Sequence, residues 1–241
     1  MEDTVPTVVL VNPNTNAQTT AMMTELVRPE LAAAGLTVEG ITVAHGPRML
    51  ADPVVLAAAE AHVVDAVRRR LAVDRADHGQ PRDDEVVGVI VAAIGDPGRD
   101  RLEDELELPV IGIGQASILA AARGGRRFGM ATSTPLLAGS LTALVARWGH
   151  SDTFTGVRLT ESEPLVLAAD PERQFHELAV AVRACAADGA EAVIIAGGPL
   201  SGTARRLAEL NLTPIVEPLP TAAALALTDL RSRRSRRSRE A

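Results

Sequence analysis

Hydrophobic residues in this chain alternate between short β-branched runs and longer stretches whose apolar positions lie three and four residues apart. The run that starts at Val89 breaks into Gly-Asp-Pro-Gly at residues 95–98. This pattern is typical of a buried parallel strand that ends in a loop before a helix. Open α/β sheets bind their ligands at that end of the strands. The chain therefore predicts an α/β fold with parallel sheets.

The same periodicities place the other elements. Expected strands are Thr7–Val11, Leu36–Val43, Val86–Ala92, Val110–Ile113, Arg127–Ala131, Val157–Leu159 and Ala192–Ala196. Expected helices run from the first turn to about Ala34 and over Val54–Ala72, Ala116–Arg123, Pro135–Trp148, Pro171–Ala187 and Thr221–Leu230. The charged stretch Asp74–Asp84 is interpreted as a surface loop.

The strand and loop at residues 89–98 recur at 193–202, an offset of 104 residues. Residues 8–15 and 128–135 form a second similar pair, because each is an apolar strand followed by Asn, Ser, Thr and Pro. A duplicated pattern predicts two pseudo-symmetric three-layer lobes with an active-site cleft between them. We expect lobe one to contain residues 1–115 and 217–230, and lobe two residues 116–216.

Length and composition fit two lobes, since 241 residues with 46% hydrophobic content can bury a sizeable core. We find no uncharged apolar run of 18 residues and no signal-peptide pattern at the start. The sequence predicts a soluble, cytoplasmic protein that does not enter a membrane.

All 24 basic residues are arginine, so no lysine can form a Schiff base or complete a phosphate-binding P-loop. The single cysteine and the five histidines show no spacing of metal ligands. We therefore expect neither a metal nor a cofactor.

The formal charge of −7 is unevenly distributed. The last eleven residues carry six Arg against Glu240, so residues 1–230 sum to −12. An acidic body argues against a nucleic-acid-binding fold. We interpret residues 231–241 as a disordered Arg/Ser tail; the alternative is a contact with RNA or an acidic partner.

The chain resembles the aspartate/glutamate/hydantoin racemase superfamily, most of all the hydantoin and allantoin racemases. The similar motifs are Val11–Thr15, His45–Pro47, Gly95–Gly98, Pro109–Ile113, Asp188–Glu191 and Gly197–Gly202. The resemblance implies a two-lobe fold with the active site between the lobes, a small-molecule substrate, no cofactor and a homo-oligomer.

Racemases of this family are understood to use two cysteines, one from each lobe, as acid and base on opposite faces of a carbon acid. The matching positions here are Ala93 and Gly197. The sole cysteine, Cys185, falls in the middle of a predicted helix, where we expect a buried, unreactive side chain. The resemblance therefore implies that two-thiol racemisation is absent.

Residues for binding a carboxylate or an enolate-like oxyanion are present at the predicted strand ends. Ordinary helix capping is the alternative role for these residue types, and the two roles are compatible. The candidates are Asn12, Asn14, Thr15 and Gly95 in lobe one, and Thr132, Ser133, Thr134 and Gly198 in lobe two.

Asp96 and His45 are the candidate catalytic residues. Asp96 follows Ala93 by three positions, but Asp-Pro-Gly is also a common helix start with Asp as the cap. His45 could titrate near neutral pH, or could be a turn residue. The glycines of Gly112-Ile-Gly114 suggest a dinucleotide loop, which we reject because the third glycine is missing.

Two functions remain open at this point. One is a cofactor-independent isomerase or lyase that acts on a small carboxylate or cyclic-imide-like substrate by stabilising an oxyanion or enolate. The other is a non-catalytic binding or regulatory protein that keeps the same fold and pocket.

Overall fold

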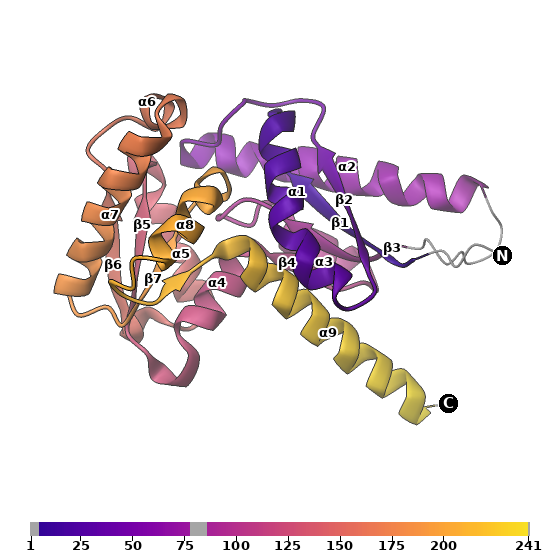
Figure 1. Ribbon diagram of the computed structural model, residues 1–241. Helices are drawn as coiled ribbons and strands as arrows, with labels where there is room; N and C mark the ends of the chain where they lie inside the picture. The colour runs from indigo at the N-terminus through magenta and orange to yellow at the C-terminus, as the bar shows by residue number, and fades with distance from the viewer. Residues whose placement is uncertain (1–4, 78–85, 241) are drawn as a thin grey trace.

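The computed structural model describes residues 5–77 and 86–240, which form two lobes built on parallel sheets (Figure 1). The first sheet has the order β2-β1-β3-β4 and the second β6-β5-β7-β8, so both repeat one topology. Every paired strand is parallel to its neighbour. The strands are β1 (Thr7–Asn12), β2 (Thr37–Thr42), β3 (Val86–Val91), β4 (Val110–Gly112), β5 (Phe128–Thr132), β6 (Phe154–Leu159), β7 (Ala192–Ile195) and β8 (Ile215–Val216).

Helices cover both faces of each sheet, which confirms the predicted α/β architecture. On the first sheet, α1 and α9 cover one face and α2 and α3 the other. On the second sheet, α4 and α5 oppose α7 and α8. The helices are α1 (Ala17–Ala32), α2 (Pro53–Asp77), α3 (Arg99–Glu105), α4 (Ile113–Ala121), α5 (Ala138–Arg147), α6 (Pro164–Ala169), α7 (Pro171–Ala187), α8 (Ser201–Ala208) and α9 (Pro218–Glu240).

Strand alternation explains these layers. Leu10 on β1 packs with Met23 and Val27 of α1, whereas the next residue, Val11, packs with Val63 of α2 on the opposite face. All of these side chains are fully buried. A central strand covered on both faces needs apolar residues at successive positions, as its sequence shows.

The last helix returns from lobe two to the first sheet, where Leu219, Ala222 and Ala226 are buried beside β3 and β4 (Figure 1). Beyond Leu230 it continues as helix through Glu240, in place of the disordered tail that the sequence predicts. Arginine is a good helix former, and the Ser232 and Ser235 hydroxyls donate to carbonyl oxygens four residues earlier.

Other differences from the predicted elements are local. Helix α6 was not predicted, because six residues that start with Pro164 are too few to show a helical period. Helix α4 begins directly after β4, at Ile113. Helix α2 extends through Asp77 into the predicted surface loop, and residues 78–85 of that loop lie outside the described residues. Within the described parts of the chain, no helix has the length and apolarity needed to cross a membrane.

Candidate active site

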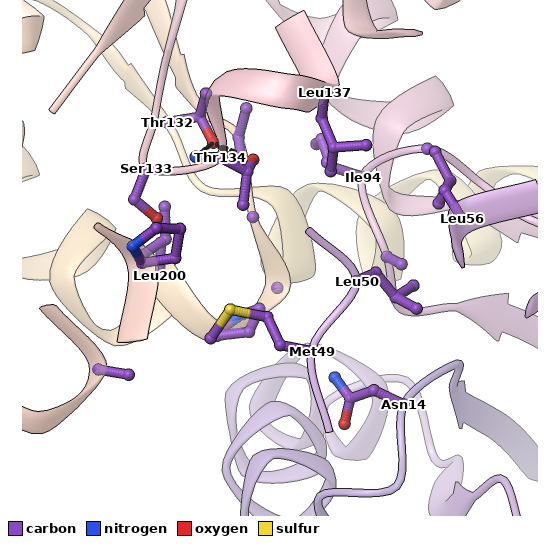
Figure 2. A pocket seen from close by; sticks show the side chains of 18 of the residues that line it. Asn14, Met49, Leu50, Leu56, Ile94, Thr132, Ser133, Thr134, Leu137 and Leu200 are labelled. Carbon is purple, nitrogen blue, oxygen red and sulfur yellow. Dashed lines mark hydrogen bonds between the residues drawn. The ribbon is translucent and has the colours of Figure 1, made fainter. Parts of the chain in front are cut away.

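A cavity lies between the lobes, at the carboxyl ends of β1, β3, β5 and β7 (Figure 2). Its empty volume is about 660 Å³, including the space open to solvent at its mouth. From lobe one it is lined by Asn14, Met49, Leu50, Leu56, Ala92, Ala93, Ile94 and Gly95. From lobe two it is lined by Thr132, Ser133, Thr134, Leu137, Pro164, Ala168, Gln174, Ala196, Gly197, Gly198, Pro199 and Leu200.

Ala93 and Gly197 both line this cavity, one from each lobe. Gly197 has a φ of 169°, which is extended backbone that any residue adopts. A Cβ built there would lie 3.1 Å from the Leu200 side chain, so Leu200 would have to move by a few tenths of an ångström. Larger side chains at positions 93 and 197 would therefore both extend into the same cavity.

Asn14 presents a hydrogen-bond donor to the cavity from the β1–α1 turn. Its amide oxygen accepts from the Asn12 side-chain nitrogen at 3.0 Å and from the Asn16 backbone N–H at 2.9 Å. Because the oxygen is occupied by two donors, the amide nitrogen is the atom left to face a ligand. Figure 2 shows this nitrogen turned toward the cavity.

The Thr132 hydroxyl is committed to holding β5 against β7. It lies 2.8 Å from the Ala196 carbonyl oxygen, to which it must donate its one proton. The Thr134 hydroxyl, 3.1 Å away, is then the donor to Thr132. Ser133 lies beside them, buried and with its side chain toward the cavity (Figure 2). Ser133 is thus the hydroxyl donor of this cluster, and Thr134 supplies oxygen lone pairs.

Gly95 and Gly198 line the cavity through their backbones and permit close packing. A Cβ at Gly198 would lie 2.9 Å from the Ala92 carbonyl oxygen and 2.8 Å from the Met23 sulfur, both of lobe one. Only glycine lets the two lobes approach this closely. A Cβ at Gly95 would overlap the Leu56 side chain.

Asn12 and Thr15 do not line the cavity, contrary to the expectation that they bind substrate. Asn12 is fully buried, and its side-chain nitrogen lies within 3.0 Å of Thr20 Oγ1 and 3.2 Å of the Asn16 carbonyl. Thr15 donates its backbone N–H to the Pro47 carbonyl at 3.0 Å. Both residues belong to the turn that presents Asn14, and neither caps a helix: the cap of α1 is Asn16, whose side-chain oxygen accepts the Gln18 and Thr19 N–H groups.

Asp96 is also placed away from the cavity lining, as the cap of a helix. Its carboxylate accepts the backbone N–H groups of Gly114 at 2.8 Å and Gln115 at 2.6 Å. The capped helix is α4 and not the adjacent α3, which begins after Gly98. A catalytic role for Asp96 on a ligand in this cavity is therefore not supported by its position.

The glycines at 112 and 114 make room for this cap. A Cβ at Gly112 would overlap the Asp96 carboxyl group, and one at Gly114 would overlap the Ile94 carbonyl oxygen. Their presence after a strand is thus explained by packing against residues 94–96, in agreement with our rejection of a dinucleotide loop.

Burial raises the pKa of the Asp96 carboxyl to about 7. The two backbone N–H groups and the nearby Arg99 and Arg147 guanidinium groups act in the opposite direction. Asp96 also lines a second, polar cleft with an empty volume of about 640 Å³, which shares Gly95 and Leu56 with the cavity. The remaining walls of that cleft include Glu60, Asp100, Arg101, Ser140 and Arg147.

His45 is exposed on the surface, in a hollow that is separate from the cavity. Its ring centroid lies 6.4 Å from that of His62. The prediction that His45 acts on the ligand is not supported, because His45 is not among the residues that line the cavity. Within the described parts of the chain, no group of three or more His, Cys, Asp or Glu could hold a metal ion.

Several lining residues could not be found from sequence. Met49 and Leu50 come from the loop between β2 and α2, Leu56 from α2, and Pro164 and Ala168 from the unpredicted α6. Gln174 of α7 is buried, with its amide oxygen 2.6 Å from the Thr203 hydroxyl. These positions carry no local motif, and only the tertiary fold brings them together.

Among the described residues that line the cavity, none is Asp, Glu, His, Cys, Arg or Lys. Cys185 lies on α7 in the core, 3.5 Å from the Met130 carbonyl oxygen. Burial raises the pKa of its thiol to about 11, so the nucleophilic thiolate is scarce at neutral pH. The prediction of a buried, helical cysteine is confirmed.

Comparison with known proteins gives the family. Residues 8–226 match the profile described as Asp/Glu/Hydantoin racemase. The chain belongs to this family. A hydantoin racemase of Paenarthrobacter aurescens is 23% identical over 220 residues, which are 91% of this chain and 89% of that protein.

Solved structures of other proteins share the fold. Allantoin racemase from Pseudomonas fluorescens has a TM-score of 0.77 at 23% identity, covering 93% of this chain and 91% of its own. Arylmalonate decarboxylase has a TM-score of 0.56 at 18% identity, covering 92% of both chains. The two-lobe parallel α/β architecture is thus common to relatives named for racemisation and for decarboxylation.

Proposed function

We propose that this member of the family is a cofactor-independent isomerase or lyase of a small carboxylate or cyclic-imide-like compound. It acts by stabilising an enolate-type oxyanion, without the two-cysteine mechanism. The observation that carries the proposal is the composition of the cavity. The strand-end positions Ala93 and Gly197 share it with neutral hydrogen-bond donors, and none of the described lining residues is an acid or a base.

The donors suit an oxyanion. The Asn14 amide and the Ser133 hydroxyl approach from opposite lobes, and the loop 197–200 leads into α8. A preorganised donor in a site that excludes water contributes on the order of 3 kcal/mol to transition-state stabilisation. Because these donors are neutral, the ligand itself would carry the main charge in the site.

The absence of a lining acid or base favours loss of a carboxylate over abstraction of a proton. In such a step the bond from the α-carbon to the carboxylate carbon breaks and carbon dioxide leaves. The electron pair stays on the α-carbon and spreads onto the remaining carbonyl oxygen, which Asn14 and Ser133 would stabilise. Water then supplies the proton to the α-carbon and is left as hydroxide. No side chain has to act as a base.

The second candidate is a non-catalytic binding protein. It is favoured by the same observation, because a pocket that needs only to hold a ligand needs no titratable group. The two functions predict the same binding residues and differ in turnover.

The deciding experiment is to identify, by native mass spectrometry, the ligand carried by protein purified from its own host, and then to assay turnover of that ligand. We expect release of carbon dioxide or exchange of the α-proton in deuterated water. Loss of the Asn14 or Ser133 donor by substitution with Ala should lower turnover about 100-fold. Thr142→Ala is the matched control, because that hydroxyl is exposed on α5. Tight binding without turnover would assign the protein to the non-catalytic class.

A further inference from the structure

The hydroxyl side chains of the cavity lie on a different side from most of its large apolar side chains (Figure 2). In Figure 2, Leu137, Ile94, Leu56 and Leu50 lie on one side of the view, and the three hydroxyl residues lie on the other, with Leu200 below Ser133. The Asn14 amide lies apart from the hydroxyls, near Met49 and Leu50 (Figure 2). Ile94 is only 5% exposed and Leu137 only 3% exposed. A ligand with one polar end and one apolar end would match both sides at once.

Charge sharpens this match. A ligand carboxylate can accept from the Ser133 hydroxyl on one side of the cavity or from the Asn14 amide of the other lobe, which are both neutral donors. A second carboxylate would also have to lie within this lining, where none of the described residues offers a cation and Leu50, Leu56 and Ile94 offer no hydrogen-bond donor from their side chains. Removing such a group from water without a partner is strongly unfavourable. The cavity therefore selects against doubly charged ligands.

One short loop, between β2 and α2, contributes Met49 and Leu50 to the cavity lining. Met49 and Leu50 lie between two anchored positions: Pro47, whose carbonyl accepts the Thr15 N–H, and Asp52, whose carboxylate accepts the Val54 and Val55 N–H groups at 2.9 Å. Because both ends are fixed, the two side chains between them are held in the cavity wall. The loop is thus a defined wall with its own side-chain chemistry.

We infer that Met49 and Leu50, together with Leu56, are the specificity-determining residues of this site, and that they select ligands with a single anionic head and a branched or aromatic apolar substituent. The inference rests on the proposed function only in taking the cavity as the ligand site. It assigns a substrate class, and it holds whether or not the ligand is turned over.

The test measures binding of three non-reactive probes to the full chain by calorimetry at neutral pH. Phenylacetate and 4-methylpentanoate each carry one carboxylate and an apolar group, whereas glutarate is a dianion of similar length. We expect the two monoanions to bind at least about tenfold more tightly, a difference of about 1.4 kcal/mol. Equal or tighter binding of glutarate would overturn the inference, as would failure of all three probes to bind at millimolar concentration.

A charge placed in the loop should reverse the order. Leu50→Arg is expected to weaken phenylacetate and to strengthen glutarate at least about fivefold, because the guanidinium supplies the missing partner. Leu165→Arg is the matched control: Leu165 is 72% exposed on α6 and does not line the cavity. Met49→Arg is the second variant if Leu50→Arg does not fold by circular dichroism. An unchanged order in both loop variants would contradict the assignment.

The probes also separate this inference from the proposed function. If the probes bind in the expected order but the native ligand is not turned over, the specificity assignment is supported and the proposed enzymatic function is contradicted. Turnover of the native ligand combined with tighter binding of glutarate would support the enzymatic function and contradict the specificity assignment.

Discussion

The carboxylate of Asp96 accepts the backbone N–H of Gln115 at 2.6 Å and so ties the loop after β3 to the first turn of α4. The neighbouring residues of that loop, Ala93 to Gly95, form part of the cavity wall. Asp96 itself adopts a φ of 51°, which an aspartate tolerates better than most residues. One buried side chain thus sets how a wall of the site meets the helix between the lobes.

This cap predicts a pH dependence of stability. The folded pKa of Asp96 is raised from 3.8 to about 7, so between these values the folded state binds a proton that the unfolded state has released. The contribution of Asp96 to the free energy of unfolding should therefore fall as pH rises from about 4 to 7 and stay level above, by up to about 4 kcal/mol. Urea unfolding of the protein and of Asp96→Asn across this range isolates the effect as their difference. Asp104→Asn, on exposed α3 surface, is the control. A difference that does not vary with pH would contradict the raised pKa.

Two glycines at equivalent places in their helices should respond in opposite directions to alanine. Gly114 is the second residue of α4, and its Cβ would overlap the Ile94 carbonyl. Gly139 is the second residue of α5, and its Cβ would meet nothing within 4 Å. We expect Gly114→Ala to lower the free energy of unfolding by about 1–3 kcal/mol and Gly139→Ala to raise it by up to about 1 kcal/mol. Thermal unfolding of the two variants tests both signs, and equal effects would refute the packing argument.

Treatment of the native protein with a thiol-alkylating reagent should leave ligand binding unchanged. Cys185 is 1% exposed and its thiol pKa is raised, so iodoacetamide should not react with the native protein and ligand binding should be unchanged. Mass spectrometry should show full modification only after denaturation in urea. Loss of ligand binding on native alkylation, with circular dichroism unchanged, would show that Cys185 contributes to the site.

Thiols placed at the two strand ends should create proton exchange. The double substitution Ala93→Cys with Gly197→Cys puts both thiols into one cavity, and the extended φ of Gly197 allows the new side chain. We expect the double variant to exchange the α-proton of 5-substituted hydantoins in deuterated water and to invert configuration. Each single variant should fail to invert, because the opposite face then lacks its acid. A double variant that is no more active than the singles would contradict the pairing of these two positions.

The strands and the duplicated topology could be predicted from sequence because β-branched runs and strand-end motifs are local signals. The sequence could also predict that Thr132–Thr134, Gly95 and Gly198 line the cavity. These residues follow parallel strands, and the carboxyl ends of parallel strands meet at one edge of a sheet. Asp96 and His45 could not be placed, because a side chain near a strand end can point to a helix terminus or to solvent as readily as to a ligand. Leu56 and Gln174 were missed because their helices reach the cavity only through tertiary packing.

Helix α9 lies at the end of the chain and covers a face of the sheet built from its beginning. Until residues 218–226 have left the ribosome, Val8, Leu10, Ile90 and Ile111 lack part of their apolar cover. The four strands of lobe two lie between residues 128 and 216, and no described residue of α9 belongs to its two apolar clusters. Lobe one is therefore synthesised first but completed last. Lobe two can bury its apolar core as soon as its own strands and helices are made, whereas the core of lobe one is fully covered only after α9 has been made.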